Sequence, residues 1–93
     1  MSEWKDTTTY SRGQKDRTPT TFSIRLTRQF SITITNAHIY YPGDWVMHLH
    51  PVFECRLLGA DTLEEAKAEA LQVALVEFDE AKSVIESVVL AAI

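Results

Sequence analysis

Apolar and polar residues alternate along residues 22–35, and this alternation predicts β-strands with one buried face. The apolar positions are Phe22, Ile24, Leu26, Phe30, Ile32 and Ile34. Serine, threonine and arginine fill the positions between them, as expected for a face in contact with water. Arg28 interrupts the apolar row, and no glycine lies nearby to make a tight hairpin. The pattern therefore leaves open whether residues 22–35 form one strand or two.

A second alternating segment begins after Pro42 and Gly43, a pair that suits the middle of a type II turn. In this segment Trp45, Met47 and Leu49 share one face, and Val46, His48 and His50 share the other. Pro51 has no N–H to donate, so it marks a strand end, an edge or a bulge. Residues 52–58 are predicted to form a further strand, with Phe53, Cys55 and Leu57 in line.

Beyond Gly59 the apolar spacing changes to steps of three and four residues, which is typical of an amphipathic helix. The predicted apolar stripe consists of Leu63, Ala66, Ala70, Leu71, Ala74, Leu75 and Phe78. Asp61 is predicted to cap the helix, with Glu64 reaching back to it in a capping box. Because glycine and proline are absent after Gly59, the helix is predicted over about residues 62–88.

The C-terminal residues extend the apolar pattern further than one small sheet can cover. A helix over residues 62–88 is about 40 Å long, whereas a compact domain of this size spans about 25–30 Å. A break near Lys82 is the alternative, because the SVIE sequence that follows repeats the capping-box pattern. In either case an apolar end remains, made of Val84, Ile85, Val88, Val89, Leu90 and Ile93. These side chains predict a homodimer or a bound partner that covers them.

Residues 1–20 are polar and rich in threonine, and they show neither a strand period nor a helix period. A segment that buries so little apolar surface is predicted to be mobile on its own. The chain is therefore predicted to be an α+β protein, with a basic N-terminal tail over residues 1–20 and a single domain over residues 21–93. In that domain an antiparallel sheet of three to four strands, built from β-hairpins, packs against one long C-terminal helix.

The composition indicates the cellular compartment and shows how charge is distributed along the chain. The chain of 93 residues has one cysteine, which allows no internal disulfide and suits a reducing cytosol. No signal peptide or membrane-spanning segment is predicted, so we expect a cytoplasmic protein. The net charge of −4 is uneven, because residues 1–30 hold six basic and three acidic residues, whereas residues 31–93 hold three basic and ten acidic ones. This asymmetry indicates either a basic tail that contacts nucleic acid or an acidic partner, or a tail and helix that attract one another.

Three histidines are the only candidates for a metal site. His48 and His50 lie two residues apart, so they point to the same face of one strand. If residues 42–44 form a three-residue loop, His38 lies directly across from His48. Imidazoles can bind zinc, but no fourth ligand is evident in the sequence, so neither a metal nor another cofactor is predicted.

Other chemistry is not indicated by the spacing of reactive residues. Cys55 is predicted among core positions, where a lone cysteine is usually inert packing. The paired acids Glu64 and Glu65 are predicted on a solvated helix face and not at a cleft. The three glycines do not form a phosphate-binding loop. These features predict that the protein is not an enzyme.

The segment 44–71 contains DWVM and then LLGADTLEEA, and it resembles HicB-type antitoxin domains. Those domains pair a strand of the G-Y/W-V type with a helix that starts as G-D-T-x-E-E-A. The chain departs from that family in its basic N-terminal tail and in lacking the usual C-terminal DNA-binding module. The resemblance implies a sheet of three or four strands with one helix packed across it, acting by docking and not by catalysis.

In overall style the chain also resembles small proteins of phages and other mobile elements, among them anti-CRISPR proteins. The resemblance implies a non-enzymatic inhibitor in the cytoplasm of a bacterial host. Its partner would be a nucleic-acid-processing complex, such as a CRISPR effector or another nuclease assembly. The predicted partner-binding residues are Arg12, Lys15, Arg17, Arg25, Arg28, Glu64, Glu65, Glu69, Glu77 and Glu80. The glutamates would mimic phosphates in a basic channel, while the basic tail contacts RNA or an acidic surface.

Three alternatives remain at this point. The first is a HicB-like antitoxin that neutralises a small ribonuclease. The second is an RNA-binding module that uses the sheet with Arg17, Arg25 and Arg28, although a pI near 5.2 opposes phosphate binding. The third is a structural phage protein that dimerises through its apolar C-terminus.

Overall fold

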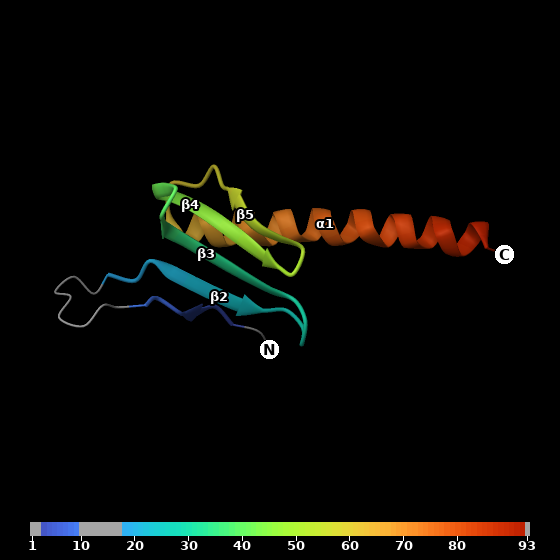
Figure 1. Cartoon of the computed structure of the whole chain (residues 1–93), viewed down its shortest axis with the longest axis horizontal. Helices are drawn as coiled ribbons and strands as arrows, with labels where there is room; N and C mark the ends of the chain where they lie inside the picture. Colours follow the sequence, from blue (N-terminus) through green and yellow to red (C-terminus); the bar gives the residue numbers. More distant parts are fainter. Residues whose placement is uncertain (1–2, 10–17, 93) are drawn as a thin grey trace.

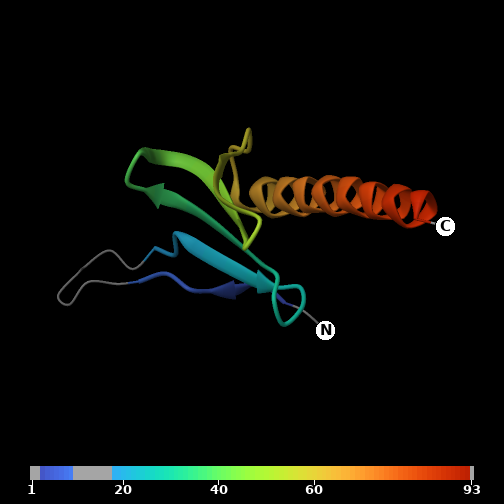
Figure 2. The ribbon, with the colours of Figure 1, turned by 45° about the vertical axis from the view of Figure 1, so that its right-hand side comes forward.

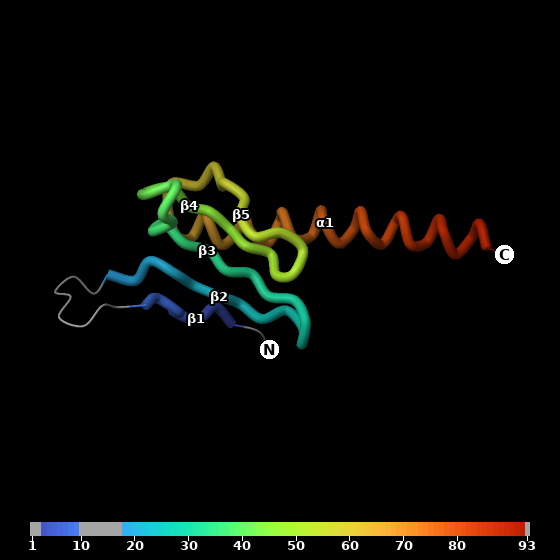
Figure 3. The backbone as a smooth tube through the Cα atoms, viewed as in Figure 1, coloured from blue at the N-terminus to red at the C-terminus, as the bar shows by residue number. Residues whose placement is uncertain are grey.

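The structure, a computed structural model, describes residues 3–9 and 18–92, and this part of the chain forms five strands followed by one long helix (Figure 1). The elements are β1 (Lys5–Asp6), β2 (Thr21–Arg25), β3 (Ser31–His38), β4 (Tyr41–His50), β5 (Phe53–Leu57) and α1 (Leu63–Ala91). The strands form one antiparallel sheet in chain order, as the tube in Figure 3 shows. The predicted α+β class is confirmed, but the sheet has five strands and not three or four. The additional strand is β1, which pairs with β2 inside the segment predicted to be a tail.

The sheet and the helix form two layers with the core between them. The core residues are Ile24, Ile32, Ile34, Trp45, Met47, Leu49, Leu58, Ala66, Ala70 and Ala74. The strands therefore supply the large side chains, whereas the helix supplies three alanines at steps of four residues. These alanines let the helix lie close to β3 and β4. The second face of the sheet, here called the open face, carries no helix (Figure 2).

Residues 22–35 form two strands, which settles the question that the alternation left open. Thr27 makes the turn between them, because its hydroxyl accepts hydrogen bonds from the backbone N–H groups of Gln29 and Phe30. Leu26 and Thr27 also donate their N–H groups to the Phe30 carbonyl. The hydroxyl of Thr27 thus stabilises a turn that contains no glycine.

The chain does not reverse at residues 42–44 as predicted. It reverses at Ile39 and Tyr40, which lie between the paired residues His38 and Tyr41. The Pro-Gly pair lies inside β4, where two extra residues bulge opposite Asn36, and Gly43 has the positive φ of 86° that this bulge requires. As a result His38 pairs with Tyr41, and Thr33 is the residue across from His48.

A second bulge changes the faces of β5. Leu49 pairs with Phe53, but Met47 pairs with Arg56, so β5 contains one extra residue. Phe53 and Arg56 therefore face the helix, while Cys55 is exposed. The predicted core position of Cys55 is wrong for this reason. Leu57 is also exposed, and Leu58 enters the core instead.

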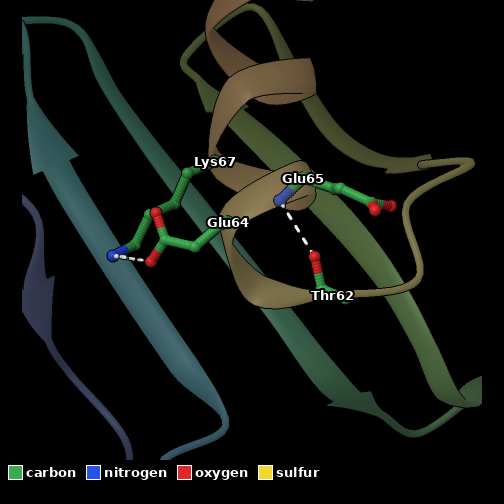
Figure 4. Close-up of polar contacts among 4 residues, drawn as sticks. All are labelled: Thr62, Glu64, Glu65 and Lys67. Carbon is green, nitrogen blue, oxygen red and sulfur yellow. Dashed lines mark hydrogen bonds and ion pairs between the residues drawn. The ribbon is translucent and has the colours of Figure 1, made fainter.

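The N-cap of the helix lies one residue later than predicted. Thr62 is the N-cap, and its hydroxyl accepts a hydrogen bond from the backbone N–H of Glu65 (Figure 4). The Glu65 carboxylate accepts in turn from the N–H of Asp61 at 3.1 Å. The predicted box of Asp61 with Glu64 is therefore wrong by one position. The helix then runs without interruption to Ala91, so the alternative of a break near Lys82 is also wrong.

The helix extends well beyond the sheet (Figure 1). The molecule is 61 Å long but only 26 by 21 Å in cross-section. Phe78 is the last helix residue that packs against the core, and every residue from 79 to 91 is exposed. We call residues 79–91 the overhang. Leu75, predicted in the buried stripe, is also exposed, and Val73 packs against the core in its place.

Within residues 3–9 and 18–92, no helix combines the length and the apolar character needed to cross a membrane.

We predict that Thr62→Ala lowers the free energy of unfolding by about 1 kcal/mol, because the first helical turn loses its cap. Asp61→Ala is the matched control, since the side chain of Asp61 does not cap the helix. It removes only a favourable charge near the helix N-terminus, worth a few tenths of a kcal/mol. Urea unfolding of both variants measures the difference, and an equal loss in both would contradict the assignment of Thr62 as the cap.

Candidate functional site

The predicted basic residues fall into two groups. Arg12, Lys15 and Arg17 lie outside the described residues. Arg25 ends β2 and Arg28 lies in the β2–β3 turn, and both are exposed. Within the described chain neither Arg25 nor Arg28 has a carboxylate within 4 Å, and the same holds for Lys5.

The five predicted glutamates do not act as one acidic surface. Both carboxylate oxygens of Glu69 accept hydrogen bonds from the Gly59 N–H, at 3.1 and 2.8 Å. Glu77 forms an ion pair with Arg56 at 3.0 Å, and the Arg56 guanidinium lies 4.5 Å from the centre of the Phe53 ring. Together with Glu65 at the helix cap, these glutamates fix the helix to β5 and to the connection that follows it.

Glu64 and Glu80 are the two predicted glutamates that remain directed to solvent. The Glu64 side chain is 83% exposed, although its carboxylate lies 3.5 Å from the Lys67 amine (Figure 4). Glu80 is exposed on the overhang, beside the exposed Asp79. The acidic surface available to a partner is therefore smaller than predicted and lies at two separate places on the helix.

Hydroxyl groups cover the β1–β3 part of the open face. The Ser23 hydroxyl bonds to those of Thr7 and Thr33, at 3.1 and 2.8 Å, and Thr21 bonds to Thr35 at 3.0 Å. Two basic residues, Lys5 and Arg25, and one acidic residue, Glu3, border a shallow depression of about 630 Å³ over these strands. The residues of β1 and β2 on this face, and those of β3 up to Thr35, include no aromatic ring. The rings of His38, Tyr41 and His48 adjoin one another at the β3–β4 end. The cations of the β1–β2 part therefore lie on a surface that has no stacking platform for bases.

The three histidines are only partly brought together. The ring centres of His38 and His48 are 6.0 Å apart, in spite of the corrected register. His50 pairs with Ser31 at the far end of β4. Among the described residues, no three histidine, cysteine, aspartate or glutamate side chains gather in a way that could hold a metal ion.

Burial is the main cause that lowers the pKa of His48 from its ordinary value of 6.5. The nearby His38 and, more weakly, His50 lower this pKa further, because a second positive charge is unfavourable there. Glu54 acts in the opposite direction and raises it. His48 therefore resists protonation in the folded chain.

The turn between β3 and β4 exposes large side chains that the sequence analysis did not select. Ile39 is 83% exposed and Tyr40 is 80% exposed. We call residues 39–41 the hairpin tip. The ring of His38 supports the tip, with its centre 5.7 Å from that of Tyr40 and 5.6 Å from that of Tyr41. His38 Nδ1 also accepts a hydrogen bond from the Tyr40 N–H. The sequence analysis missed this turn because Pro42 and Gly43, three residues later, are more typical turn residues than Ile39 and Tyr40.

The overhang exposes the largest number of apolar side chains. The exposed large apolar residues of α1 are Leu75, Val76, Val84, Ile85, Val88, Val89 and Leu90. A depression of about 420 Å³ lies where the overhang begins, and it is lined by Leu75, Val76, Phe78, Asp79 and Lys82. The predicted need for cover at the C-terminus is thus still present in the folded chain.

Comparison with protein-family models, with curated proteins and with solved structures finds no match to this chain.

We predict that Glu69→Ala lowers the free energy of unfolding by about 1–2 kcal/mol, because the Gly59 N–H loses a charged acceptor. Glu80→Ala is the matched control on the same helix, and its effect should stay within about 0.5 kcal/mol. Thermal and urea unfolding measure both variants. Equal stabilities would show that the Glu69 contact does not hold the β5–α1 connection.

We predict that the protein loses stability as the pH falls below 6.5. Above this pH His48 is neutral in both the folded and the unfolded chain. Just below it the unfolded chain takes up the proton first, because the folded pKa is lower, so unfolding becomes more favourable. His48→Gln should remove this part of the pH dependence in urea titrations. Glu54→Gln should increase it, because Glu54 raises the pKa of His48, and an unchanged slope in both variants would contradict the assignment.

Proposed function

We propose that the protein is a non-enzymatic inhibitor that docks onto a bacterial nucleic-acid-processing complex, such as a CRISPR effector or another nuclease assembly. The observation that carries the proposal is the hairpin tip, which exposes an isoleucine and a tyrosine at the end of a fixed hairpin. Exposed tyrosines on a supported backbone are typical anchors of protein–protein interfaces.

Support for the tip as an anchor comes from its preorganisation. Tyr40 is held by a backbone hydrogen bond to His38 and by contact with the His38 ring. A side chain that is already oriented loses less conformational entropy when a partner pocket encloses it. Burial of Ile39 in the same contact would add apolar surface at little further cost.

Support for a nucleic-acid-processing partner comes from the separation of charge. Lys5, Arg25 and Arg28 lie on the β1–β2 side without carboxylate partners in the described chain, whereas Glu64 and Glu80 lie on the helix. A nuclease assembly presents both basic channels and bound phosphates, so opposite surfaces of one small protein have complementary sites there. The basic residues of the N-terminal segment would add contacts to RNA.

A HicB-like antitoxin is the second proposal. The sheet with one helix packed across it is the arrangement that the resemblance implies. In this case the partner is a single small ribonuclease and not a multi-subunit complex. An RNA-binding module has less support, because the chain is acidic and the β1–β2 part of the open face, which carries Lys5 and Arg25, has no aromatic ring.

The test is a pull-down of tagged protein from a bacterial lysate, with and without nuclease treatment, followed by mass spectrometry and RNA sequencing. Recovery of a multi-subunit nuclease whose activity falls when purified protein is added would support the inhibitor. Recovery of one small ribonuclease would favour the antitoxin. RNA alone, lost after nuclease treatment, would favour the RNA-binding module and reject both protein partners.

We predict that Tyr40→Ala weakens binding to the recovered complex about tenfold or more, because a central anchor is lost. Val52→Ala is the matched control, since Val52 is an exposed apolar residue in a different turn of the same sheet. Surface plasmon resonance with the purified complex measures both affinities. Equal affinities of the two variants would reject the hairpin tip as the docking site.

A further inference from the structure

The turn at the hairpin tip depends on one nitrogen of the His38 ring. The backbone N–H of Tyr40 donates to Nδ1 of His38 at 3.1 Å. A neutral imidazole has one nitrogen that accepts and one that carries the proton, so His38 holds its proton on Nε2 in this arrangement. An imidazolium carries a proton on both nitrogens and accepts no hydrogen bond. The bond to Tyr40 therefore exists only while His38 is neutral.

The backbone of the tip explains why this bond matters. His38 and Tyr41 are paired, so the loop of the hairpin consists of two residues, Ile39 and Tyr40. The favoured two-residue loops, types I′ and II′, need a positive φ at one or both of these residues. Neither residue has a positive φ, as expected for a β-branched and an aromatic side chain. The loop thus lacks the geometry that matches the twist of the strands, and the His38 side chain supplies a bond to its backbone instead.

The ring of His38 also contacts both tyrosines of the tip. The hydrogen bond to the Tyr40 N–H and the contacts with the rings of Tyr40 and Tyr41 are all made from one position of the imidazole. A proton on Nδ1 would point at the Tyr40 N–H, and two donors at this distance repel one another. The protonated ring must therefore turn so that its Nδ1–H reaches water, because an unpaired polar group is costly. The tip then loses its support.

Acidic groups do not hold a protonated His38 in place. The side chain is half-buried, and no carboxylate of residues 3–9 and 18–92 lies within 4 Å of it. Residues 18–20, which precede β2, contain no titratable side chain. The titratable groups of β4 and of the start of β5 are Tyr41, Asp44, His48, His50 and Glu54. Among them the ring of His48 lies 6.0 Å from that of His38, and two imidazolium charges at this distance oppose one another.

We propose that His38 makes the hairpin tip sensitive to pH. The neutral ring fixes the Tyr40 backbone, and uptake of a second proton by the ring releases it. The change falls between about pH 5 and pH 8, where imidazoles titrate. It is local, because the tip lies at the end of the sheet opposite to the overhang (Figure 1) and none of residues 38–41 packs against the core cluster.

The consequence for binding rests on the proposed function, in which Tyr40 anchors the protein to its target. A released tip must be ordered again when a partner encloses it, and this cost weakens the complex. The protein would therefore bind its target more tightly in neutral than in acidic solution. The order of the tip itself can be measured without any partner.

Nuclear magnetic resonance of the full chain tests the release. The signal of the Tyr40 amide and its ¹⁵N relaxation are followed from about pH 8 to about pH 5, together with the carbon-bound protons of the His38 ring. The Tyr40 order parameter should fall from about 0.85 to below about 0.6 along the titration curve of His38. A Tyr40 amide that stays ordered while the His38 ring titrates would overturn the proposal, and so would a His38 ring that stays neutral down to pH 5.

Substitutions separate the acceptor of His38 from its charge. His38→Asn keeps an acceptor for the N–H two residues further on, as in an Asx-turn, and does not titrate, so its tip should be ordered at both pH values. His38→Ala has no acceptor, and its tip should be mobile at both. His50→Gln is the matched control, because it removes an imidazole from the far end of β4 and should keep the wild-type response. A pH response that persists in His38→Asn would contradict the role of His38.

Surface plasmon resonance with the purified complex, at about pH 8 and about pH 5.5, tests the regulation. The wild-type affinity should fall about two- to tenfold more than that of His38→Asn, which reports the pH dependence of the partner alone. Equal changes in both would reject the regulation. Release of the tip in a protein whose Tyr40→Ala variant binds normally would reject the docking site and keep the pH-sensitive tip. Weak binding of Tyr40→Ala with a tip that ignores pH would do the reverse.

Discussion

The close approach of the helix to the sheet is the constraint on which the rest of the structure depends. Ala66, Ala70 and Ala74 form a line of small side chains, and the fully buried residues opposite them are Ile32, Ile34, Met47 and Leu49 from the strands. Val46 is also fully buried, but it faces away from the helix and does not belong to the core cluster. A larger side chain in the alanine line would lift the helix from the sheet and leave cavities around the isoleucines. The direction in which the overhang leaves the sheet is fixed by the same contact.

The two bulges decide which side chains the open face and the sheet edge present. Without the bulge at Gly43, the register of Thr35 with Val46 would place His38 opposite Gly43 and not opposite Tyr41, and the turn would fall at residues 40–41. Without the bulge in β5, Arg56 would point away from the helix and could not pair with Glu77. In both cases one or two extra residues in a strand change which side chains lie opposite one another in the sheet.

The alternation along β2, β3 and β4 was sufficient to predict the α+β fold and the core face of the strands. Periodicity identified the helix as well, because Ala66, Ala70 and Ala74 recur at four-residue steps. It failed where a local hydrogen bond replaced the expected turn residue, as Thr27 does, and where a bulge inverted the faces after Phe53. The cap was misplaced because Asp61 and Thr62 both suit the position, and only the backbone shows which one precedes the first helical residue. For the candidate sites, sequence alone identified the exposed C-terminal stripe but not the hairpin tip. It could not show that Glu69 and Glu77 are occupied by contacts within the chain, because those contacts join residues that are distant in sequence.

The edge-to-face contact of Phe78 with Phe30, 5.0 Å between ring centres, is the last point at which the helix touches the sheet side of the molecule. One continuous helix therefore contains two stretches with different structural roles. Substitutions before this contact alter the core and are limited by folding. Substitutions after it alter no contact between the helix and the sheet, so the chemistry of that surface is not tied to the packing of the core.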